Sequence, residues 1–342
     1  MGVGEVSFAA DEAVDLASGL EAAITRAGHP GRVEGLSRLS AGATQEIWSF
    51  NLVADGDVRP LILRRAPAAR KLSAFAMPLD REARLVERVA ANGVPVPSVA
   101  LILQPEDGLR EGYVMARIVG ETLPPRIIRK PEFAAARTVF AGQAGDILAR
   151  LHAVPLEGLD LAGGDAGELV ARLGRLYDET GRRRPVFDLA LAWMAAHLPP
   201  PVAPALVHGD FRNGNLMFDP DGIVAVLDWE LAHVGDPVED IGWLTVNSWR
   251  FGVRDRPVGG LADIAPFLSA YEGVSGRCVE PERLRFWQVY GTMRWGVMCA
   301  AMVGDVESGA DRTPERAMIA RRASETEIDL LDLLLPEGAV HA

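Results

Sequence analysis

Strand-like and helix-like patterns occupy different parts of this chain, and that segregation constrains the fold most. Short β-like runs such as "QEIWSFNLV", "RPLILRR" and "GYVMARIVG" fill the first third, separated by turns such as "ADGD" and "PEDG". A helix is predicted over 11–27, and another over 80–91 with Asp80 as its N-cap and "NG" as its stop. We therefore expect an antiparallel sheet with one inserted helix in this third.

The rest of the chain has mostly helical spacing, interrupted between 205 and 227 by two short β-like runs. The motif "GETLPP" breaks the periodicity between the two parts. The fold class predicted is α+β with two domains, over 1–118 and 119–342. Helices are expected over 132–152, 167–177, 186–197, 264–271, 281–302 and 314–335.

Composition limits the partners and the compartment. The formal net charge of −12 argues against nucleic acid or an anionic membrane as the main partner. No apolar run is long enough to span a bilayer, and the first 15 residues lack the pattern of a secretion signal. Two cysteines, Cys278 and Cys299, make no disulfide framework. We expect a cytoplasmic protein with no obligate protein partner.

The stretch "LVHGDFRNGNLMFD" places polar residues between two apolar arms. The runs "NLMF" and "IVAVLDW" are joined by "DPDG", which is a strong turn signal and predicts a hairpin. Antiparallel pairing brings Asn215, at the start of the first run, towards Asp228, at the end of the second. Asp210 lies five residues before Asn215, on the loop that enters the hairpin.

Oxygen-bearing side chains of these types suit Mg²⁺, which also binds waters and substrate phosphates. A further carboxylate that binds no metal can act as a base towards a hydroxyl. Asp and Asn at this spacing, followed by an Asp after a later strand, are typical of kinase-type phosphoryl transfer. Each residue alone also fits a structural role: Asp210 in an Asx-turn, Asn215 in a hairpin and Asp228 as a cap. The joint pattern favours the catalytic interpretation.

The motif "HGDFRNGN" followed by "LDWE" resembles the aminoglycoside phosphotransferase family, within the protein-kinase-like fold. The longer string "LDWELAHVGDPVEDIGWL" resembles the branch related to the kinase-like domain fused to some acyl-CoA dehydrogenases. The resemblance covers about 30 to about 300 and is strongest over 206–244. It implies a two-lobed fold, with a small antiparallel-sheet lobe and a larger helical lobe, that uses ATP, or alternatively GTP, with Mg²⁺.

The resemblance also implies roles for individual residues. Asp210 resembles the catalytic base, and Asn215 and Asp228 resemble the Mg²⁺ ligands. His208 resembles a loop histidine that holds the loop's shape. Asp240 resembles an aspartate at a helix start that braces the catalytic loop from behind.

A kinase-like fold also requires a phosphate-covering turn in the first third. The candidate turn, "LSAGATQEIW", has a single glycine, Gly42. The hydroxyls of Ser40 and Thr44, together with backbone amides, can approach phosphates. This turn is therefore assigned to nucleotide binding.

The same fold requires a cation on the third strand and a carboxylate on the following helix. Arg64 matches the cation position and can grip phosphate through two hydrogen bonds, but its neighbour Arg65 leaves open which side chain faces inward. Glu82 shares an apolar stripe with Val86 and Val89, so it needs a cationic partner. We expect Glu82 to pair with Arg64, the alternative being a local arginine.

The resemblance places the adenine-reading hinge in "YVMARIVG", at Ala116 and Ile118.

The sequence gives fewer signals for the part of the chain that binds the acceptor. The arginines at 182–184 either bind an anionic acceptor or form a solvated helix end. The C-terminal part contains four tryptophans that either line an apolar pocket or pack helices: Trp243, Trp249, Trp287 and Trp295.

These features favour an ATP-dependent small-molecule phosphotransferase whose acceptor is a hydroxyacyl-CoA or another apolar alcohol. The alternatives are an antibiotic phosphotransferase, for an aminoglycoside or a macrolide, and a non-catalytic nucleotide-binding regulator. A protein kinase is disfavoured because "LAHVGDPVEDIGW" is too short to contain an activation segment.

Overall fold

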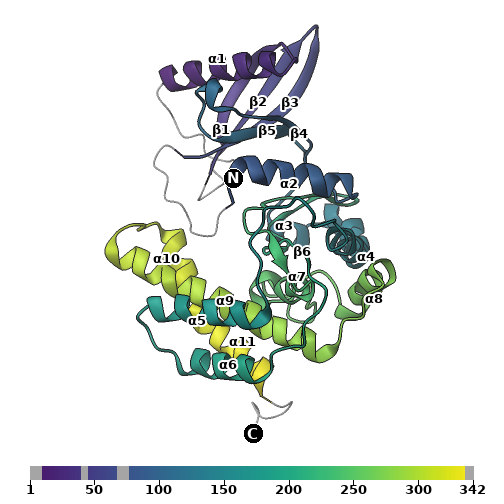
Figure 1. Ribbon diagram of the computed structural model, residues 1–342, viewed down its shortest axis with the longest axis vertical. Coiled ribbons are helices and arrows are strands. Elements are labelled where there is room, and N and C mark those ends of the chain that lie inside the picture. The colour runs from purple at the N-terminus through teal and green to yellow at the C-terminus, as the bar shows by residue number, and fades with distance from the viewer. Residues whose placement is uncertain (1–9, 40–44, 68–76, 336–342) are drawn as a thin grey trace. The chain divides into compact units, whose positions relative to one another are not determined.

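The computed structural model describes residues 10–39, 45–67 and 77–335, and is shown in Figure 1. The chain forms two compact units. The first contains the chain up to Gly120 together with Val224–Leu231, and the second contains Glu121–Ile223 and the chain from Ala232 onward. The sequence did not predict that the chain would return to the first unit for Val224–Leu231.

The first unit is built on a five-stranded antiparallel sheet with the order β1-β2-β3-β5-β4. The central strand β3 pairs with β2 on one side and β5 on the other, so that Arg64 lies between Ile47 and Tyr113. Its elements are α1 (Ala10–Arg26), β1 (Arg32–Leu39), β2 (Glu46–Ala54), β3 (Asp57–Arg65), α2 (Leu79–Ala91), β4 (Val99–Ile102), η1 (Pro105–Asp107) and β5 (Gly112–Ala116).

Helix α1 and the sheet share an apolar core. The predicted helical spacing places Leu16, Leu20 and Ile24 on one face, where they are buried against strand residues that include Trp48 and Phe50. The predicted helix over 11–27 and the antiparallel sheet are therefore confirmed.

Helix α2 corrects one expectation. The N-cap is Pro78, not Asp80, which lies in the first turn. The carboxylate that serves the helix start comes from another segment: Glu111 Oε1 accepts the N–H of Leu79 at 2.6 Å. The helix ends before Asn92, as the "NG" stop predicted.

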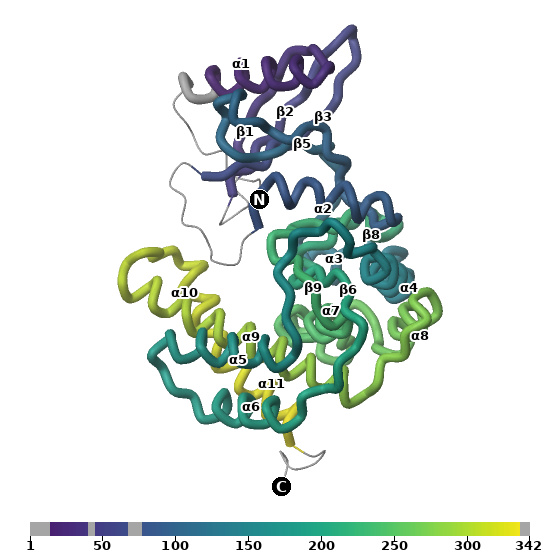
Figure 2. Tube along the Cα trace, in the orientation of Figure 1, coloured from purple at the N-terminus to yellow at the C-terminus, as the bar shows by residue number. Residues whose placement is uncertain are grey.

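The second unit is mostly helical. The long helix α9 packs against α5, α6, α7, α10 and α11, and α4 packs against α8 (Figure 2). Its helical elements are α3 (Pro124–Arg129), η2 (Pro131–Phe133), α4 (Ala134–Leu151), α5 (Ala166–Glu179), α6 (Pro185–Ala196), α7 (Val238–Leu244), η3 (Asn247–Arg250), α8 (Ile264–Ser275), α9 (Pro281–Ser308), α10 (Pro314–Ala320) and α11 (Ala323–Leu334).

One predicted helix is wrong in extent. The single helix expected over 314–335 is two helices, α10 and α11. The backbone forms a tight turn between them, in which the N–H of Arg322 donates to the carbonyl of Ile319, three residues earlier. Ala320 and Ala323 are buried on either side of the break. The short helix α3 was not predicted.

The predicted hairpin is present. Strands β7 (Leu216–Asp219) and β8 (Gly222–Val226) form a two-stranded sheet. Its turn is closed by the Asp219 carboxylate, whose Oδ1 accepts the N–H of Asp221 at 2.8 Å and of Gly222 at 2.9 Å. A second pair, β6 (Ala205–Val207) with β9 (His233–Gly235), flanks the polar loop that precedes the hairpin.

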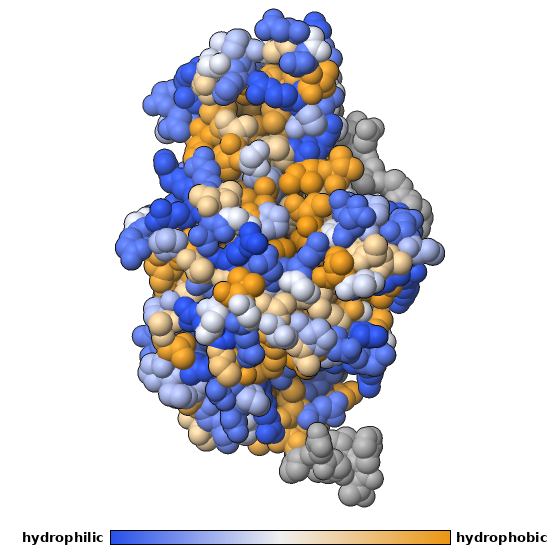
Figure 3. Space-filling view, turned by 90° about the vertical axis from the view of Figure 1, so that its right-hand side faces the viewer, coloured by the Kyte–Doolittle hydropathy of each residue, from blue (hydrophilic) through white to orange (hydrophobic). Residues whose placement is uncertain are grey.

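Among the described residues, no helix is long and apolar enough to cross a membrane. Hydrophobic patches on the face in Figure 3 are bordered by hydrophilic residues. The larger exposed hydrophobic side chains, among them Val119, Met318 and Ile328, come from different parts of the chain.

Candidate active site

Arg64 is the centre of a charged cluster in the first unit. Its Nε lies 3.2 Å from Glu82 Oε1, and its Nη2 lies 2.9 Å from Asp228 Oδ1. Glu230 is 3.8 Å away from the same Nη2. The Arg64–Glu82 ion pair expected from the sequence is therefore present.

The neighbouring Arg65 has different partners. Its Nε donates to Glu46 Oε2 at 2.8 Å, and its guanidinium lies 5.4 Å from the centre of the Trp48 ring. Glu46 also accepts from Arg110 at 2.9 Å. Since adjacent strand residues point to opposite faces, Arg64 is the one that contacts Glu82.

Burial sets the protonation balance of this cluster. The Glu82 side chain is 1% exposed, and Tyr113 donates its O–H to Oε1 at 3.1 Å. Burial raises the pKa of Glu82 to about 7, although the Arg64 guanidinium opposes the rise. Burial also lowers the pKa of Arg64, but the negative charges of Glu82 and Asp228 outweigh the effect of burial. The pKa of Arg64 is therefore raised above its usual value. Arg64 therefore stays charged.

Asp228 follows β8 in an uncommon backbone conformation. Its φ is 66°, in the left-handed region that few residues other than glycine and short polar side chains adopt. Such positions cluster at ligand-binding and catalytic sites, where surrounding contacts maintain them. Here the carboxylate is held by Arg64 while the side chain stays 36% exposed.

Asp210, the predicted base, lies in the second unit on the loop after β6. Its Oδ1 accepts from Trp243 Nε1 at 2.7 Å and from Arg212 Nε at 3.0 Å. Its Oδ2 accepts from Asn215 Nδ2 at 2.7 Å. Its own N–H donates to His208 Nδ1 at 3.2 Å. Asp210 and Asn215 are therefore brought into direct contact.

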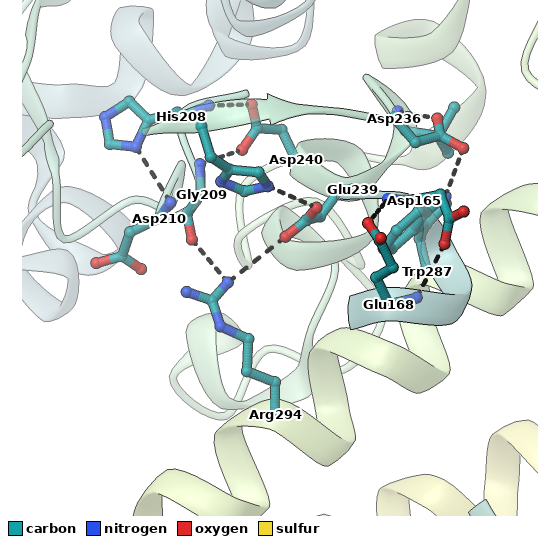
Figure 4. Close-up of polar contacts among 12 residues, drawn as sticks. Asp165, Glu168, His208, Gly209, Asp210, Asp236, Glu239, Asp240, Trp287 and Arg294 are labelled. Atoms are coloured by element: carbon teal, nitrogen blue, oxygen red, sulfur yellow. Dashed lines mark hydrogen bonds and ion pairs between the residues drawn. The ribbon is translucent and has the colours of Figure 1, made fainter. Parts of the chain in front are cut away.

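The loop is braced by Asp240, in the first turn of α7 (Figure 4). Asp240 is fully buried and accepts the N–H of His208 at 2.8 Å and of Gly209 at 3.0 Å. His152 Nε2 lies 3.2 Å from the same carboxylate. Burial raises the pKa of Asp240, but the His152 hydrogen bond and charge bring it below its usual range. These contacts agree with the bracing role predicted for Asp240 and the structural role predicted for His208.

Three residues around this loop were missed from the sequence: His152, which contacts Asp240, Trp243 as a partner of Asp210, and Arg294. Arg294, on α9, donates to the Gly209 carbonyl at 2.8 Å (Figure 4). Its guanidinium lies 4.6 Å from the centre of the Trp243 ring. For Arg294, the only signal in the sequence was a lone charge in the apolar run "TMRWG".

Asn215, in the second unit, and Asp228, in the first, each carry a side-chain oxygen of the kind that Mg²⁺ prefers. Asn215 uses its amide nitrogen for the carbonyl and Oδ2 of Asp210, which leaves its amide oxygen for another ligand. Asp228 engages Arg64 through Oδ1. Magnesium sites supplied by one or two protein oxygens complete their shell with water and substrate phosphates. Within the described ranges, no group of three or more His, Cys, Asp or Glu residues could hold a metal ion.

The remaining predicted nucleotide contacts have different outcomes. Ser40, Gly42 and Thr44 lie outside the described residues. The N–H of Ala116, at the end of β5, donates to the Ser98 carbonyl at 2.9 Å, so this donor is engaged within the sheet. Ile118 follows β5 and is partly buried.

The tryptophans pack between helices. Trp243 and Trp249 have ring centres 5.2 Å apart, and Trp249 and Trp295 have ring centres 4.8 Å apart. Trp287 packs elsewhere, against Phe286, and its indole N–H donates to Asp236 Oδ2. All four side chains are buried, which agrees with the helix-packing interpretation.

The arginines at 182–184 are paired with carboxylates. Arg182 lies 2.6 Å from Glu307, and Arg184 lies 2.6 Å from Glu327. The Arg183 side chain is 70% exposed. These contacts favour the solvated helix end over an anion site.

A family model described as "Phosphotransferase enzyme family" matches residues 35–277, which include Arg64, Glu82, Asp210, Asn215 and Asp228. The chain belongs to the phosphotransferase enzyme family.

A curated relative matches part of the chain, and solved structures agree with its fold. Acyl-CoA dehydrogenase family member 10 of Mus musculus is 30% identical over 197 residues, which are 54% of this chain but 18% of the mouse protein. The chain thus spans less than a fifth of that relative's length. A proposed aminoglycoside phosphotransferase from Ralstonia eutropha superposes with a TM-score of 0.75 at 22% identity, covering 92% of this chain and 97% of the other.

A second similar structure is a thermostable mutant of an aminoglycoside phosphotransferase, in ternary complex with AMP-PNP and hygromycin B. Its TM-score is 0.60 at 18% identity, covering 88% of this chain and 94% of the other. Together these structures confirm the two-lobed, kinase-like α+β fold that the sequence predicted.

Proposed function

We propose that this phosphotransferase moves the γ-phosphoryl group of ATP to the hydroxyl of a small molecule. The observation that carries the proposal is the arrangement of Asp210, whose carboxylate is fixed by Trp243, Arg212 and Asn215 on a loop that Asp240 braces. A fixed carboxylate can orient an acceptor hydroxyl and take its proton as the new phosphorus–oxygen bond forms. The phosphotransferase complex with AMP-PNP supports ATP as the donor.

Roles on the phosphate side are assigned residue by residue from the motifs. In the first unit, Arg64, oriented by Glu82, neutralises phosphate charge, and Asp228 offers a side-chain oxygen to Mg²⁺. In the second unit, Asn215 offers its amide oxygen to Mg²⁺. When bound, Mg²⁺ supplies charge stabilisation on the phosphate oxygens.

Two further segments are assigned to nucleotide binding. Ser40, Gly42 and Thr44 are assigned to phosphate binding from the motif, through hydroxyls and backbone amides. Ala116 and Ile118 bind the adenine edge through backbone groups other than the Ala116 N–H, which is engaged with Ser98.

The proposed acceptor is a hydroxyacyl-CoA or another apolar alcohol, not a polycation. Arg212 contacts Asp210 directly, and Arg294 binds the adjacent Gly209 carbonyl. Both guanidiniums lie over tryptophan rings, Arg212 over Trp249 and Arg294 over Trp243. Two fixed cations beside the base disfavour an aminoglycoside, and the name of the mouse relative supports an acyl-CoA class.

The test is mass spectrometry of reactions with Mg-ATP and a pooled set of acceptors. The pool contains 3- and 4-hydroxyacyl-CoAs, simple alcohols and sugars, aminoglycosides and macrolides, and a parallel reaction replaces ATP with GTP. We expect a gain of one phosphate on the hydroxyacyl-CoA or alcohol class. Asp210→Ala should abolish it, a loss of at least about 100-fold, while ATP binding persists.

Phosphate on an aminoglycoside or macrolide would replace the proposed acceptor class and keep the reaction. Turnover that survives in Asp210→Ala would remove Asp210 as the base. ATP binding without transfer to any acceptor would favour the non-catalytic regulator.

A further inference from the structure

The two oxygens of the Asp210 carboxylate have unequal surroundings. A carboxylate offers about four lone-pair sites, two on each oxygen. Within the described part of the chain, Oδ1 accepts two hydrogen bonds, from Trp243 and Arg212, and Oδ2 accepts one, from Asn215. Three sites are thus occupied, and the remaining site is on Oδ2.

We propose that Oδ2 is the oxygen that takes the acceptor's proton, and that Trp243 is a positioning residue that keeps Oδ1 out of the reaction. This inference rests on the proposed function. The acceptor hydroxyl gives its proton to Oδ2, and its oxygen forms the new bond to the γ-phosphorus. The bond from that phosphorus to the β–γ bridging oxygen breaks, and ADP leaves.

Trp243 can position the carboxylate because it is itself held on several sides. Its N–H donates to Oδ1 at 2.7 Å, which is short for a nitrogen donor and typical of a hydrogen bond to a charged acceptor. Its ring packs on Trp249, with centres 5.2 Å apart. The Arg294 guanidinium lies 4.6 Å from its ring centre.

Arg294 ties this arrangement to helix α9. It binds the Gly209 carbonyl, one residue before Asp210, and lies 3.9 Å from Glu239 (Figure 4). It also lies beyond residues 35–277, the segment that the family model matches. The loop that carries the base is therefore held in part by a helix that lies outside the matched segment.

The chain offers a matched pair of variants for the test. Trp243 and Trp295 belong to the same buried aromatic cluster. The Trp295 N–H has no hydrogen-bond partner among the described residues, whereas that of Trp243 binds Asp210. Trp243→Phe and Trp295→Phe therefore remove the same atoms from one cluster, and only the first removes a bond to the base.

We expect Trp243→Phe to lower kcat by about 10- to 100-fold, the cost of a hydrogen bond to a charged group, with KM for ATP within about twofold of wild type. Trp295→Phe should keep the kcat of wild type per folded molecule. Turnover is measured as ADP release with Mg-ATP and the acceptor pool, and the folded fraction by thermal unfolding. Equal kcat values for the two variants would overturn the inference.

A second variant guards against misfolding of Trp243→Phe. Benzothienylalanine at 243 keeps the shape of the indole and replaces its N–H with sulfur, so it should reproduce the loss in kcat. A benzothienylalanine enzyme as active as wild type would also overturn the inference. Wild type and Asp210→Ala run beside it: inactive wild type would contradict the proposed function itself, whereas active wild type with unaffected Trp243 variants contradicts only the role of Trp243.

Discussion

The Arg64 cluster and the Asp210 loop are each built around a charged side chain with little exposure, but they are held in different ways. Arg64 is fixed by ion pairs, to Glu82 and Asp228, inside an apolar environment. Asp210 is fixed by neutral and charged hydrogen-bond donors. Its loop is fixed because backbone N–H groups of the loop donate to the Asp240 carboxylate. The first arrangement depends on charge balance and the second on geometry.

The difference has consequences for perturbation. Removing one charge from the Arg64 cluster leaves another charge buried without its partner, which is costly. Removing one donor from Asp210 leaves the other donors in place. Changes in the first site should therefore alter charge-dependent properties such as phosphate binding and pH response, and changes in the second should alter kcat.

The largest effect is expected from Arg64→Met compared with Arg65→Met. Both arginines are buried neighbours on β3, but only Arg64 contacts Glu82 and Asp228. Arg64→Met should lower kcat/KM for ATP by about 100-fold or more, because a phosphate-neutralising charge is lost. Arg65→Met should lower stability only, since Glu46 retains Arg110. The check is steady-state kinetics of both variants; similar ATP kinetics would remove the distinction between the two faces of β3.

An intermediate effect is expected from Asp240→Asn. The amide has one oxygen and one nitrogen in place of two acceptors, so it cannot accept from both N–H groups and His152. We expect a loss of about 2–4 kcal/mol of unfolding free energy and a lower kcat. The control is Asp165→Asn, at an exposed N-cap where asparagine serves equally well (Figure 4). Urea denaturation measures both.

The pH dependence gives Asp240→Asn an independent check. Because the folded-state pKa of Asp240 is below its usual range, its stabilisation is present above the ordinary carboxyl pKa of about 4. It is lost as the pH falls towards the lower folded-state value. The stability difference between wild type and Asp240→Asn should therefore shrink in acid; a constant difference would mean that the carboxylate charge is not what braces the loop.

The smallest effect is expected from Glu82→Gln. The folded-state pKa of Glu82 is raised to about 7, so its contribution to stability is present below the unfolded pKa and is lost as the pH rises through 7. The stability of Glu82→Gln relative to wild type should therefore increase between pH 5 and pH 8, by up to about 3 kcal/mol. Denaturation at several pH values measures it. The same variant should raise KM for ATP several-fold, and unchanged ATP kinetics would remove Glu82 from the site.

Local patterns predicted much of the fold and part of the site. The "DPDG" turn and the apolar runs beside it predicted the hairpin, and the apolar stripe under Glu82 predicted its buried ion pair with Arg64. These predictions succeeded because turn chemistry and helix periodicity are properties of short segments. The Asp80 cap failed because Glu111, 32 residues from Leu79, supplies the acceptor.

The partners of Asp210 show where sequence reasoning stops. Asn215 is five residues away and was paired with Asp210 from spacing. Trp243 is 33 residues away, and Arg294 reaches the loop over 85 residues. Such contacts depend on how helices α7 and α9 pack, and helix periodicity does not specify which of many side chains meets a given loop.

The return of Val224–Leu231 to the first unit has a consequence for dissecting the enzyme. Pro95 accepts the N–H of Val226 at 2.8 Å, and Asp228 completes the pairing of Arg64 within that unit. A fragment that ends at Gly120 would lack both contacts, and no single cut in the chain separates the two units intact. An exchange of the first unit between such enzymes would have to carry two pieces of sequence together, a sheet from one place and eight residues from another.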